Sequence, residues 1–267
     1  MTLDPREGIT DDGYIATGAD WTHISPRYRA LIGECRKPLA DRLGDSLVAL
    51  FVYGSVATGQ AQAPASDLDL LAVLQDETPA AAEMAADLSA RHKGFVREVG
   101  IATTTLSAAF EDSAAALGWR AFIHHYCVHV SGRDLGSELG PFKANAEMAW
   151  AFNGDVGEAV AAQIAALHAH PSQAAGVGRT SARKLLLAGA SLVSALDGIW
   201  TTDRGIAARR LRADYPNQAG MVDRLAAWSE ECDAGADEVA SVIKSCLDWI
   251  APELARAARI RPRSIDS

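Results

Sequence analysis

Short apolar runs of strand length mark the first half of the chain. The first of them, Leu47 to Tyr53, is rich in valine and aromatic residues. A Gly54-Ser55 pair ends it, and a second run at 66–74 carries two acids among its leucines. Further runs lie at 95–103 and 126–131. Because runs of this length bounded by turn residues are typical of strands, the pattern predicts a small four-stranded sheet.

Apolar residues recur at helical spacing in the rest of the chain. In the first half this spacing predicts helices at 25–44, 78–94 and 112–125. After residue 138 long alanine- and leucine-rich segments predict helices at 142–170, 180–198, 203–213, 221–228 and 237–257. Pro38 is expected to kink or split the first helix. Thr180 is expected to cap the helix that follows a loop at 171–178.

These patterns predict an α+β fold followed by an all-α helical bundle. We expect a domain of α/β type with a small mixed sheet at residues 25–136, and the bundle at 137–267. The polar, glycine- and aspartate-rich residues 1–24 are predicted to form a flexible arm, and the polar tail 259–267 to fray.

Two acids in the second apolar run give the first indication of chemistry. Asp67 and Asp69 flank Leu68, and alternate residues of a strand point to the same face. Two carboxylates side by side repel each other, and burying them unpaired is costly. A divalent cation between them removes that cost, and hard oxygen ligands favour Mg²⁺ or Mn²⁺. The alternative is an ordinary hairpin whose two acids are solvated.

The turn between the two runs has the composition of an anion site. A glycine after a strand lets the backbone approach a ligand closely, which suits Gly54. The N–H groups of Ser55 and of the helix predicted from Val56 onward would point at an anion. The Asp-x-Asp pair follows 12 residues after Ser55. The stretch therefore predicts a phosphate cradle next to a metal-binding pair, with Ser66 beside it as a further nucleotide-binding candidate.

Composition narrows the possible partners. The chain of 267 residues has a formal net charge of −9 and is 49% hydrophobic. Such a charge argues against a broad nucleic-acid surface, which needs clustered lysine and arginine. Four scattered cysteines without a C-x-x-C pattern indicate reduced thiols in or near the core. With no visible signal peptide or membrane-length apolar run, a cytoplasmic location is expected. Nothing in the sequence specifies an oligomeric state.

The Gly54-Ser55 turn followed by Asp67-x-Asp69 resembles the signature of the polymerase-β-like nucleotidyltransferase superfamily. The resemblance implies a nucleotidyltransferase domain that binds two Mg²⁺ ions, or Mn²⁺, together with a nucleoside triphosphate. It also implies a third carboxylate on the next strand, acting as a general base or a metal ligand. Glu98 matches that position by order and context. The alternative for Glu98 is a surface acid on an edge strand, and Arg97 is expected to point to the opposite face.

The helical half is similar to the C-terminal domain of streptomycin/spectinomycin adenylyltransferases. The similar stretches are KLLLAGASLVSALDGIW and TTDRGIAARRL. Where that family has a phosphate-binding lysine, the nearest cation here is Arg204. Arg183 and Lys184 on the preceding helix are further candidates, and for all three the alternative is a solvated helix face. This resemblance implies ATP as co-substrate.

The sequence therefore predicts a metal-dependent transferase that moves AMP from ATP to a hydroxyl of a small-molecule acceptor. Resemblance suggests an aminoglycoside-type antibiotic. Because residues 178–181 lack the expected acids, other acceptors stay open: a lincosamide-like drug, a natural-product intermediate or a protein side chain. A non-catalytic nucleotide-binding protein and a toxin-partner protein are the remaining alternatives. His124, His125 and His129 are expected to be structural or half-exposed rather than metal ligands.

Overall fold

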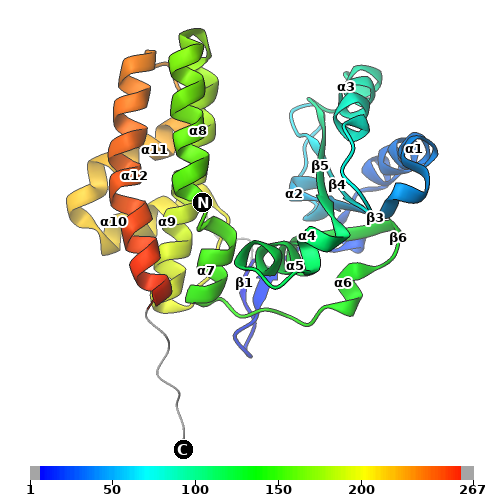
Figure 1. The fold of residues 1–267 in the computed structure, drawn as a ribbon, viewed down its shortest axis with the longest axis horizontal. Helices are drawn as coiled ribbons and strands as arrows, with labels where there is room; N and C mark the ends of the chain where they lie inside the picture. The colour runs from blue at the N-terminus through cyan, green and yellow to red at the C-terminus, as the bar shows by residue number, and fades with distance from the viewer. Residues whose placement is uncertain (1–6, 260–267) are drawn as a thin grey trace, which may run out of the picture. The chain divides into compact units, whose positions relative to one another are not determined.

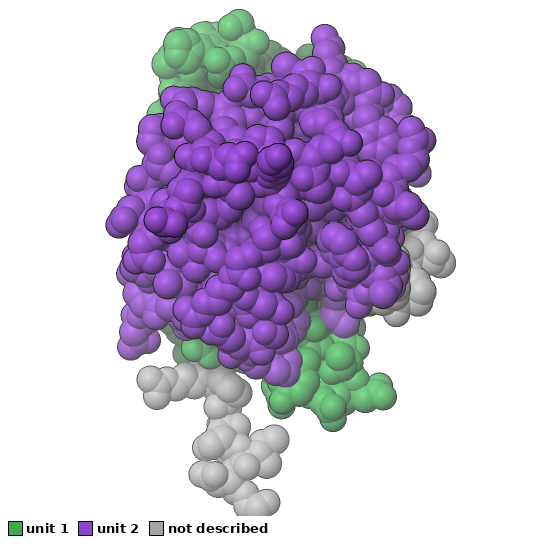
Figure 2. Space-filling model, turned by 90° about the vertical axis from the view of Figure 1, so that its right-hand side faces the viewer, with its two compact units in different colours: residues 1–15, 143–267 green, residues 16–142 purple. Residues whose placement is uncertain are grey.

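The computed structural model describes residues 7–259 (Figure 1). Within them, residues 16–142 form one compact unit, called here the sheet unit. Residues 7–15 and 143–259 form the other, called the helical unit. Figure 2 colours the sheet unit purple and the helical unit green. No helix in the described part of the chain is long and apolar enough to cross a lipid bilayer. The domain boundaries drawn from the sequence remain a prediction.

A four-stranded mixed sheet is the framework of the sheet unit, as the sequence predicts. Its strands are β3 (Leu47–Tyr53), β4 (Leu68–Leu74), β5 (Val99–Thr105) and β6 (Val128–Gly132). Their order across the sheet is β5-β4-β3-β6. Strand β3 pairs antiparallel with β4 and β6, whereas β4 and β5 run parallel.

Helices cover both faces of this sheet, so its central strands are apolar on both sides. One core contains residues from α1 (Pro26–Leu43) and α3 (Ala80–His92), packed with Leu70 and Ala72 of β4. The other contains Leu71 and Val73, packed with α4 (Leu106–Phe110), α5 (Ala114–Tyr126) and α6 (Leu135–Glu138). The alternation of β4 therefore assigns its odd-numbered residues to the α5 face.

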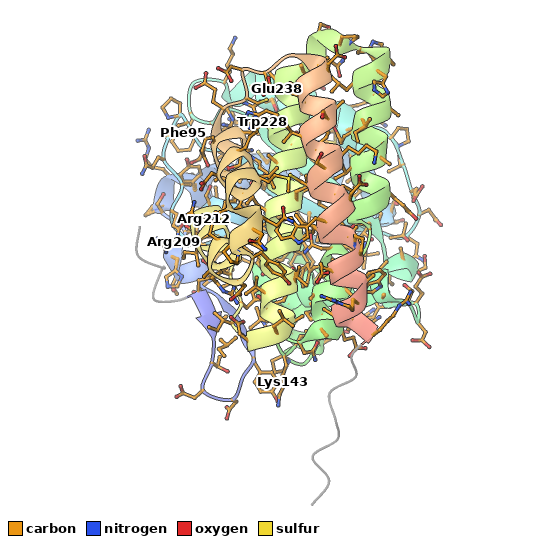
Figure 3. All side chains as sticks on the ribbon, turned by 90° about the vertical axis from the view of Figure 1, so that its left-hand side faces the viewer. Phe95, Lys143, Arg209, Arg212, Trp228 and Glu238 are labelled. Carbon is orange, nitrogen blue, oxygen red and sulfur yellow. The ribbon has the colours of Figure 1, made fainter. Side chains whose placement is uncertain are left out.

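The helical unit packs its helices around α9. Its main helices are α7 (Ala146–Asn153), α8 (Val156–Ala169), α9 (Ala174–Asp197), α10 (Arg204–Asp214), α11 (Ala219–Glu230) and α12 (Ala236–Arg259). Most of α9 is buried, and its neighbours each place one apolar stripe against it. Trp228 on α11 is one of these core residues (Figure 3). Gly198 ends α9 in the left-handed conformation, as predicted.

Short 3-10 turns connect several of these elements. They are η1 (Trp21–His23), η2 (Gly44–Ser46), η3 (Pro171–Gln173) and η4 (Pro216–Gln218). The four-residue helix α2 (Gly54–Ala57) follows β3 directly.

Two local predictions are wrong. Residues 95–98 are not part of a strand, because Phe95 N–H bonds back to His92 and closes a turn before β5. Helix α9 begins at Ala174, so Thr180 lies inside the helix instead of capping it. Of the two effects expected of Pro38, a split is excluded, because α1 continues through Pro38 to Leu43, and a kink stays a prediction.

The N-terminal residues 7–24 are also not a structureless arm. They contain β1 (Glu7–Ile9) and β2 (Ile15–Thr17), which pair with each other. The Glu7 carboxylate accepts hydrogen bonds from the Thr202 backbone N–H and from the hydroxyls of Thr201 and Thr202. These bonds hold the start of the chain to the turn between α9 and α10. Residues 1–6 and residues 260–267 lie outside the described residues, and the latter are all but the first residue of the tail predicted to fray at 259–267.

Candidate active site

Asp69 lies near the start of β4, on the face that α5 covers further along the strand. Its residue partners in the ladder are Tyr53 on β3 and Gly100 on β5. Asp67 immediately precedes β4 and is half-buried. The Asp67 carboxylate is near enough to raise the pKa of Asp69. The two carboxylates are therefore near each other, and their common orientation on one face stays a prediction.

Gly54 joins the predicted phosphate turn to this acid pair. Its φ of +70° is in the left-handed region that favours glycine. A Cβ built on Gly54 would lie 2.7 Å from Oδ2 of Asp69, and a Cβ on Gly100 would lie 3.3 Å from Oδ1. Two glycines therefore make room for the Asp69 carboxylate from opposite sides. Sequence analysis identified Gly54 and missed Gly100, whose only signal is a glycine inside a strand.

Asp69 is in an unfavourable environment for a negative charge. Burial raises its pKa to about 6, and the neighbouring Asp67 and Glu98 carboxylates add to the shift while Arg97 opposes it. No hydrogen bond from the described residues contributes to stabilising its charge. Burial also raises the pKa of the Tyr53 hydroxyl to about 12, with a contribution from Asp69. A bound divalent cation would relieve this cost directly.

Arg97 lies with the carboxylates, contrary to the prediction that it points away from them. Its Nε donates to Oδ1 of Asp67 over 2.9 Å, and Nη2 contacts Oδ2. The expected geometry failed because it assumed that residues 95–98 continue the strand. A basic residue next to the predicted base Glu98 was the only sequence signal for this ion pair.

Glu98 is exposed and precedes β5 by one residue. Its backbone oxygen accepts a 2.9 Å hydrogen bond from Leu68 N–H, which fixes Glu98 beside the start of β4. Among the described residues, no group of three or more His, Cys, Asp or Glu side chains forms a metal-binding cluster. Metal-ligand roles for Asp67, Asp69 and Glu98 therefore remain predictions.

Ser55 and Ser66 lie at the two ends of the segment that connects the Gly54-Ser55 turn to Asp67. Ser55 is half-buried near the start of α2, where backbone N–H groups lack intrahelical partners. Its carbonyl oxygen accepts bonds from Gln60 and Ala61, which curl the following loop. The Ser66 hydroxyl accepts a 2.9 Å bond from Gln62 N–H and still has its own O–H to donate.

The three predicted phosphate cations lie in the helical unit, and each has a partner there. Arg183 Nε donates to the Ser229 carbonyl over 2.8 Å. Lys184 pairs with Asp155 at 2.7 Å, and Arg204 with Glu230 at 2.7 Å. Arg204 holds the pKa of Glu230 below its usual range, with a further contribution from Arg183. Arg183 and Arg204 therefore converge on the end of α11, whereas Lys184 contacts a different element.

The Arg204 side chain has one hydrogen-bond donor, Nε, that is not used. Its Nε is buried and has no hydrogen-bond partner among the described residues. A buried donor without a partner is costly, and an added acceptor can satisfy it. Of the three predicted cations, Arg204 is therefore the one with a buried donor that lacks a partner among the described residues.

The histidines bond to backbone groups within the sheet unit. His124 Nδ1 contacts the Gly136 oxygen, and His129 Nε2 contacts the Gly132 oxygen. His125 Nε2 accepts from Phe142 N–H, and burial lowers the pKa of His125 to about 4. These contacts confirm that the three are structural. All four cysteines are free, and burial raises the pKa of Cys35 and of Cys246 to about 12.

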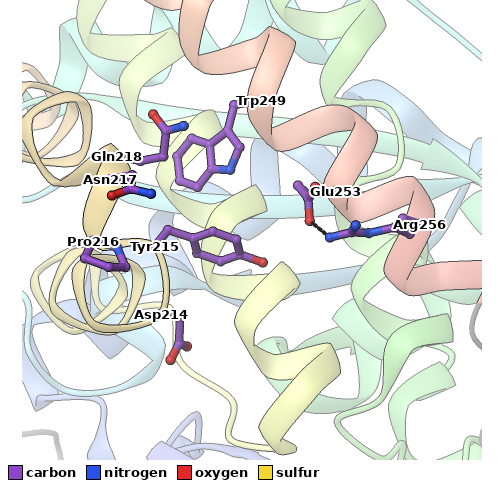
Figure 4. A pocket seen from close by; sticks show the side chains of 8 residues that line it. All are labelled: Asp214, Tyr215, Pro216, Asn217, Gln218, Trp249, Glu253 and Arg256. Atoms are coloured by element: carbon purple, nitrogen blue, oxygen red, sulfur yellow. Dashed lines mark hydrogen bonds and ion pairs between the residues drawn. The ribbon is translucent and has the colours of Figure 1, made fainter.

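Two surface pockets lie elsewhere in the units. The sheet unit has one of about 380 Å³, lined by residues of α1 and β6 such as Arg36 and Lys37. The helical unit has one of about 250 Å³, where Tyr215 meets Trp249 edge to face and Glu253 pairs with Arg256 (Figure 4). The carboxylates line neither pocket. They lie at the end of the sheet, beside the exposed Gly54 and Glu98.

Comparison with known proteins finds similarity in fold but none in sequence. No protein-family model and no curated protein sequence matches the chain. The fold is similar to a crystal structure of spectinomycin adenyltransferase AAD(9) from Enterococcus faecialis with ATP and spectinomycin. The similarity covers 86% of this chain and 97% of that chain, with 12% sequence identity and a TM-score of 0.45. At these values the likeness transfers no residue role, so the site is interpreted from its own geometry.

Proposed function

We propose that the chain is a metal-dependent nucleotidyltransferase that moves AMP from ATP to a hydroxyl of a small-molecule acceptor. The observation that carries the proposal is the contact between the turn and the acids. The position where Gly54 lacks a Cβ lies 2.7 Å from Asp69 Oδ2. A phosphate held by the turn is thereby next to a metal held by Asp69, which is the arrangement that phosphoryl-group transfer requires.

Each residue has a distinct role in this proposal. Asp67 and Asp69 would hold Mg²⁺, one ion or two, through their carboxylate oxygens. The bound metal would neutralise charge on the phosphates and keep the attacking and leaving oxygens in line. Backbone N–H groups at Gly54 and Ser55 would bind the outer phosphates.

Glu98 is proposed as the general base. It is exposed beside the acid pair, so it can accept the proton of an acceptor hydroxyl that approaches from solvent. Loss of that proton makes the acceptor oxygen a better nucleophile at the α-phosphorus. The P–O bond to the β-phosphate then breaks, and pyrophosphate leaves with its electron pair. The products are the adenylylated acceptor and pyrophosphate.

ATP and the acceptor class are proposed from the sequence resemblance. Aminoglycoside-type antibiotics are the first acceptors to test, followed by lincosamide-like drugs and other hydroxylated small molecules. The acidic composition of the chain, with a net charge of −9, is compatible with a cationic acceptor.

A pyrophosphate-release assay tests the proposal. Purified protein would be incubated with Mg²⁺ and each of ATP, GTP, CTP and UTP against a panel of hydroxylated antibiotics. We expect release that needs both a triphosphate and an acceptor, and that Asp69→Asn reduces at least 10³-fold, because the metal loses a ligand. Asp76→Asn, an exposed acid just past the other end of β4, is the matched control and should retain activity.

Two results would contradict the proposal. Equal release by wild type and Asp69→Asn would remove the acid pair from the chemistry. Tight Mg²⁺–nucleotide binding without release, against every acceptor in the panel, would instead support the non-catalytic nucleotide-binding alternative.

A further inference from the structure

The Asp67 carboxylate is already occupied by a cation of the protein itself. Arg97 contacts both of its oxygens, Oδ1 through Nε at 2.9 Å and Oδ2 through Nη2. This two-pronged contact is the strongest geometry available between a guanidinium and a carboxylate. A metal ion that binds Asp67 needs at least one of the same oxygens. The guanidinium and the metal therefore compete for one ligand.

The backbone holds Arg97 in place while its side chain stays accessible. Arg97 N–H donates to the Ser66 carbonyl over 3.1 Å, and Leu68 N–H donates to the Glu98 carbonyl. These two bonds tie the segment of Arg97 to the segment of Asp67. The Arg97 side chain is 63% exposed, whereas that of Asp67 is 24% exposed. Arg97 can therefore swing into solvent without disturbing the core, and its carboxylate partner cannot follow.

We propose that Arg97 is a positioning residue that competes with the metal ion for Asp67 and thereby makes metal binding depend on the nucleotide. The inference rests on the proposed nucleotidyl transfer. Without nucleotide, a divalent cation would have to displace the guanidinium and then lie beside it, which is unfavourable for two positive charges. The phosphates of a nucleoside triphosphate supply the negative charge that offsets this repulsion. Metal alone should bind weakly, and metal with nucleotide much better.

Metal binding, measured without turnover, tests this directly. Mn²⁺ would be titrated into wild type, Arg97→Ala, Arg97→Lys and Lys93→Ala, followed by electron paramagnetic resonance of free Mn²⁺. Each titration would be repeated with an ATP analogue that has a methylene bridge between the α- and β-phosphates. Lys93→Ala is the matched control. Lys93 is exposed at the end of α3, and its substitution removes one positive charge from the same segment between α3 and β5.

The expected affinities distinguish competition between Arg97 and Mn²⁺ from the non-specific effect of removing one positive charge. Arg97→Ala should tighten Mn²⁺ binding in the absence of nucleotide by about three- to tenfold, the range expected for one charge-assisted pair near the surface. Arg97→Lys should have a smaller effect in the same direction, because lysine keeps the positive charge but cannot bind both carboxylate oxygens as a planar guanidinium does. Lys93→Ala should change the affinity less than about twofold. The gain in affinity that the analogue provides should shrink in Arg97→Ala.

Three results would overturn the inference. They are an unchanged or weaker Mn²⁺ affinity in Arg97→Ala, an equal gain in Lys93→Ala, and an undiminished effect of the analogue. Thermal unfolding of each variant would establish that it is folded. Failure of the proposed function looks different: Asp67→Asn and Asp69→Asn would then bind Mn²⁺ with the analogue as well as wild type does.

Discussion

The candidate site residues of the two units differ in how their charges are compensated. In the helical unit Lys184 and Arg204 each have a carboxylate partner, and Arg183 donates to a backbone carbonyl. In the sheet unit Arg97 pairs with Asp67, while the half-buried Asp69 beside it has no ion pair or hydrogen bond of its own among the described residues. Compensated charges stabilise a fold or are neutral to it, whereas an uncompensated one costs free energy.

The difference indicates where a ligand is needed. A protein retains a desolvated carboxylate when something else completes the site, which makes such a group a candidate for function. The end of the sheet contains such a carboxylate, Asp69. In the helical unit the predicted cations have partners, and the exception among the described residues is the Nε of Arg204, which has none. The predictions below test that contrast in order of decreasing effect.

The largest effect is expected at Glu98. Glu98→Gln should reduce transfer by roughly 10²- to 10⁴-fold, the range for loss of a positioned base, and leave Mg²⁺–ATP binding largely intact. Steady-state pyrophosphate release and calorimetry would measure the two quantities. Glu77→Gln, an exposed residue of the same unit, should be unaffected. Loss of nucleotide binding would instead reassign Glu98 as a metal ligand.

Gly54→Ala should have the next largest effect. The added methyl group would meet Oδ2 of Asp69 and displace it, and misplacement of a catalytic group by about 1 Å costs roughly 10²-fold in rate. Gly44→Ala is the matched control, because Gly44 also has a positive φ but has nothing within 4 Å of the added Cβ. Both variants should lose stability from backbone strain. Only Gly54→Ala should lose transfer, and an equal loss in both would contradict the proposed contact.

Stability against pH should report the buried charge of Asp69. Its folded-state pKa of about 6 exceeds its ordinary value of about 4, so the folded protein binds more protons than the unfolded chain between these values. Wild-type stability should therefore fall as pH rises from about 4 to about 6. Asp69→Asn removes this penalty and should stabilise the metal-free protein at pH 7 by about 1–3 kcal/mol.

The measurement is denaturant unfolding with a chelator present, at pH 4 and at pH 7. The stabilisation by Asp69→Asn should disappear below about pH 4, where the wild-type carboxyl is protonated in both states. An equal stabilisation at both pH values would show that the substitution acts through packing rather than through ionisation.

The smallest effect is expected in the helical unit. Arg204→Ala should weaken triphosphate binding about three- to tenfold and monophosphate binding less, because the lost contact would be to the outer phosphates. Arg212→Ala is the control, because Arg212 (labelled in Figure 3) also pairs with an exposed acid. The side chains of Arg212 and Arg204 are 37% and 35% exposed. Calorimetry with both ligands would decide the question. Equal weakening by the two substitutions, or none, would leave Arg204 with a structural role only.

Strands β3 and β4, which carry the candidate site, were predictable from the sequence because each coincides with an apolar run. Strand β3 has the predicted limits, Leu47 and Tyr53, since an unbroken apolar run is bounded there by turn residues. The predicted strand at 66–74 was enough to bring Asp69 near Asp67, which immediately precedes β4. The fold class follows from the same runs and from the helical spacing after residue 138.

The errors lie where tertiary contacts override local signals. Phe95 to Glu98 has the composition of a strand, yet the N–H groups of Phe95 and Val96 bond back to the His92 carbonyl in a turn. Arg97 N–H then bonds to Ser66, a partner that is distant in sequence. Gly178 suggested a loop before α9. In the structure it is a buried helical residue where an added Cβ would collide with Cys232 Sγ, so it serves close packing instead. The predicted direction of the Arg97 side chain was wrong because it assumed that residues 95–98 form a strand.

His125 holds both ends of the sheet unit at one place. The Thr17 hydroxyl donates to its carbonyl oxygen, and Phe142 N–H donates to its ring nitrogen Nε2. These two bonds fasten the entry and the exit of the segment 16–142 to the same residue. An excised piece that starts at residue 16 would retain both bonds but would cut β2 and lose its partner β1. A cut at residue 136 would discard the second bond and leave the histidine ring with a buried nitrogen and no donor.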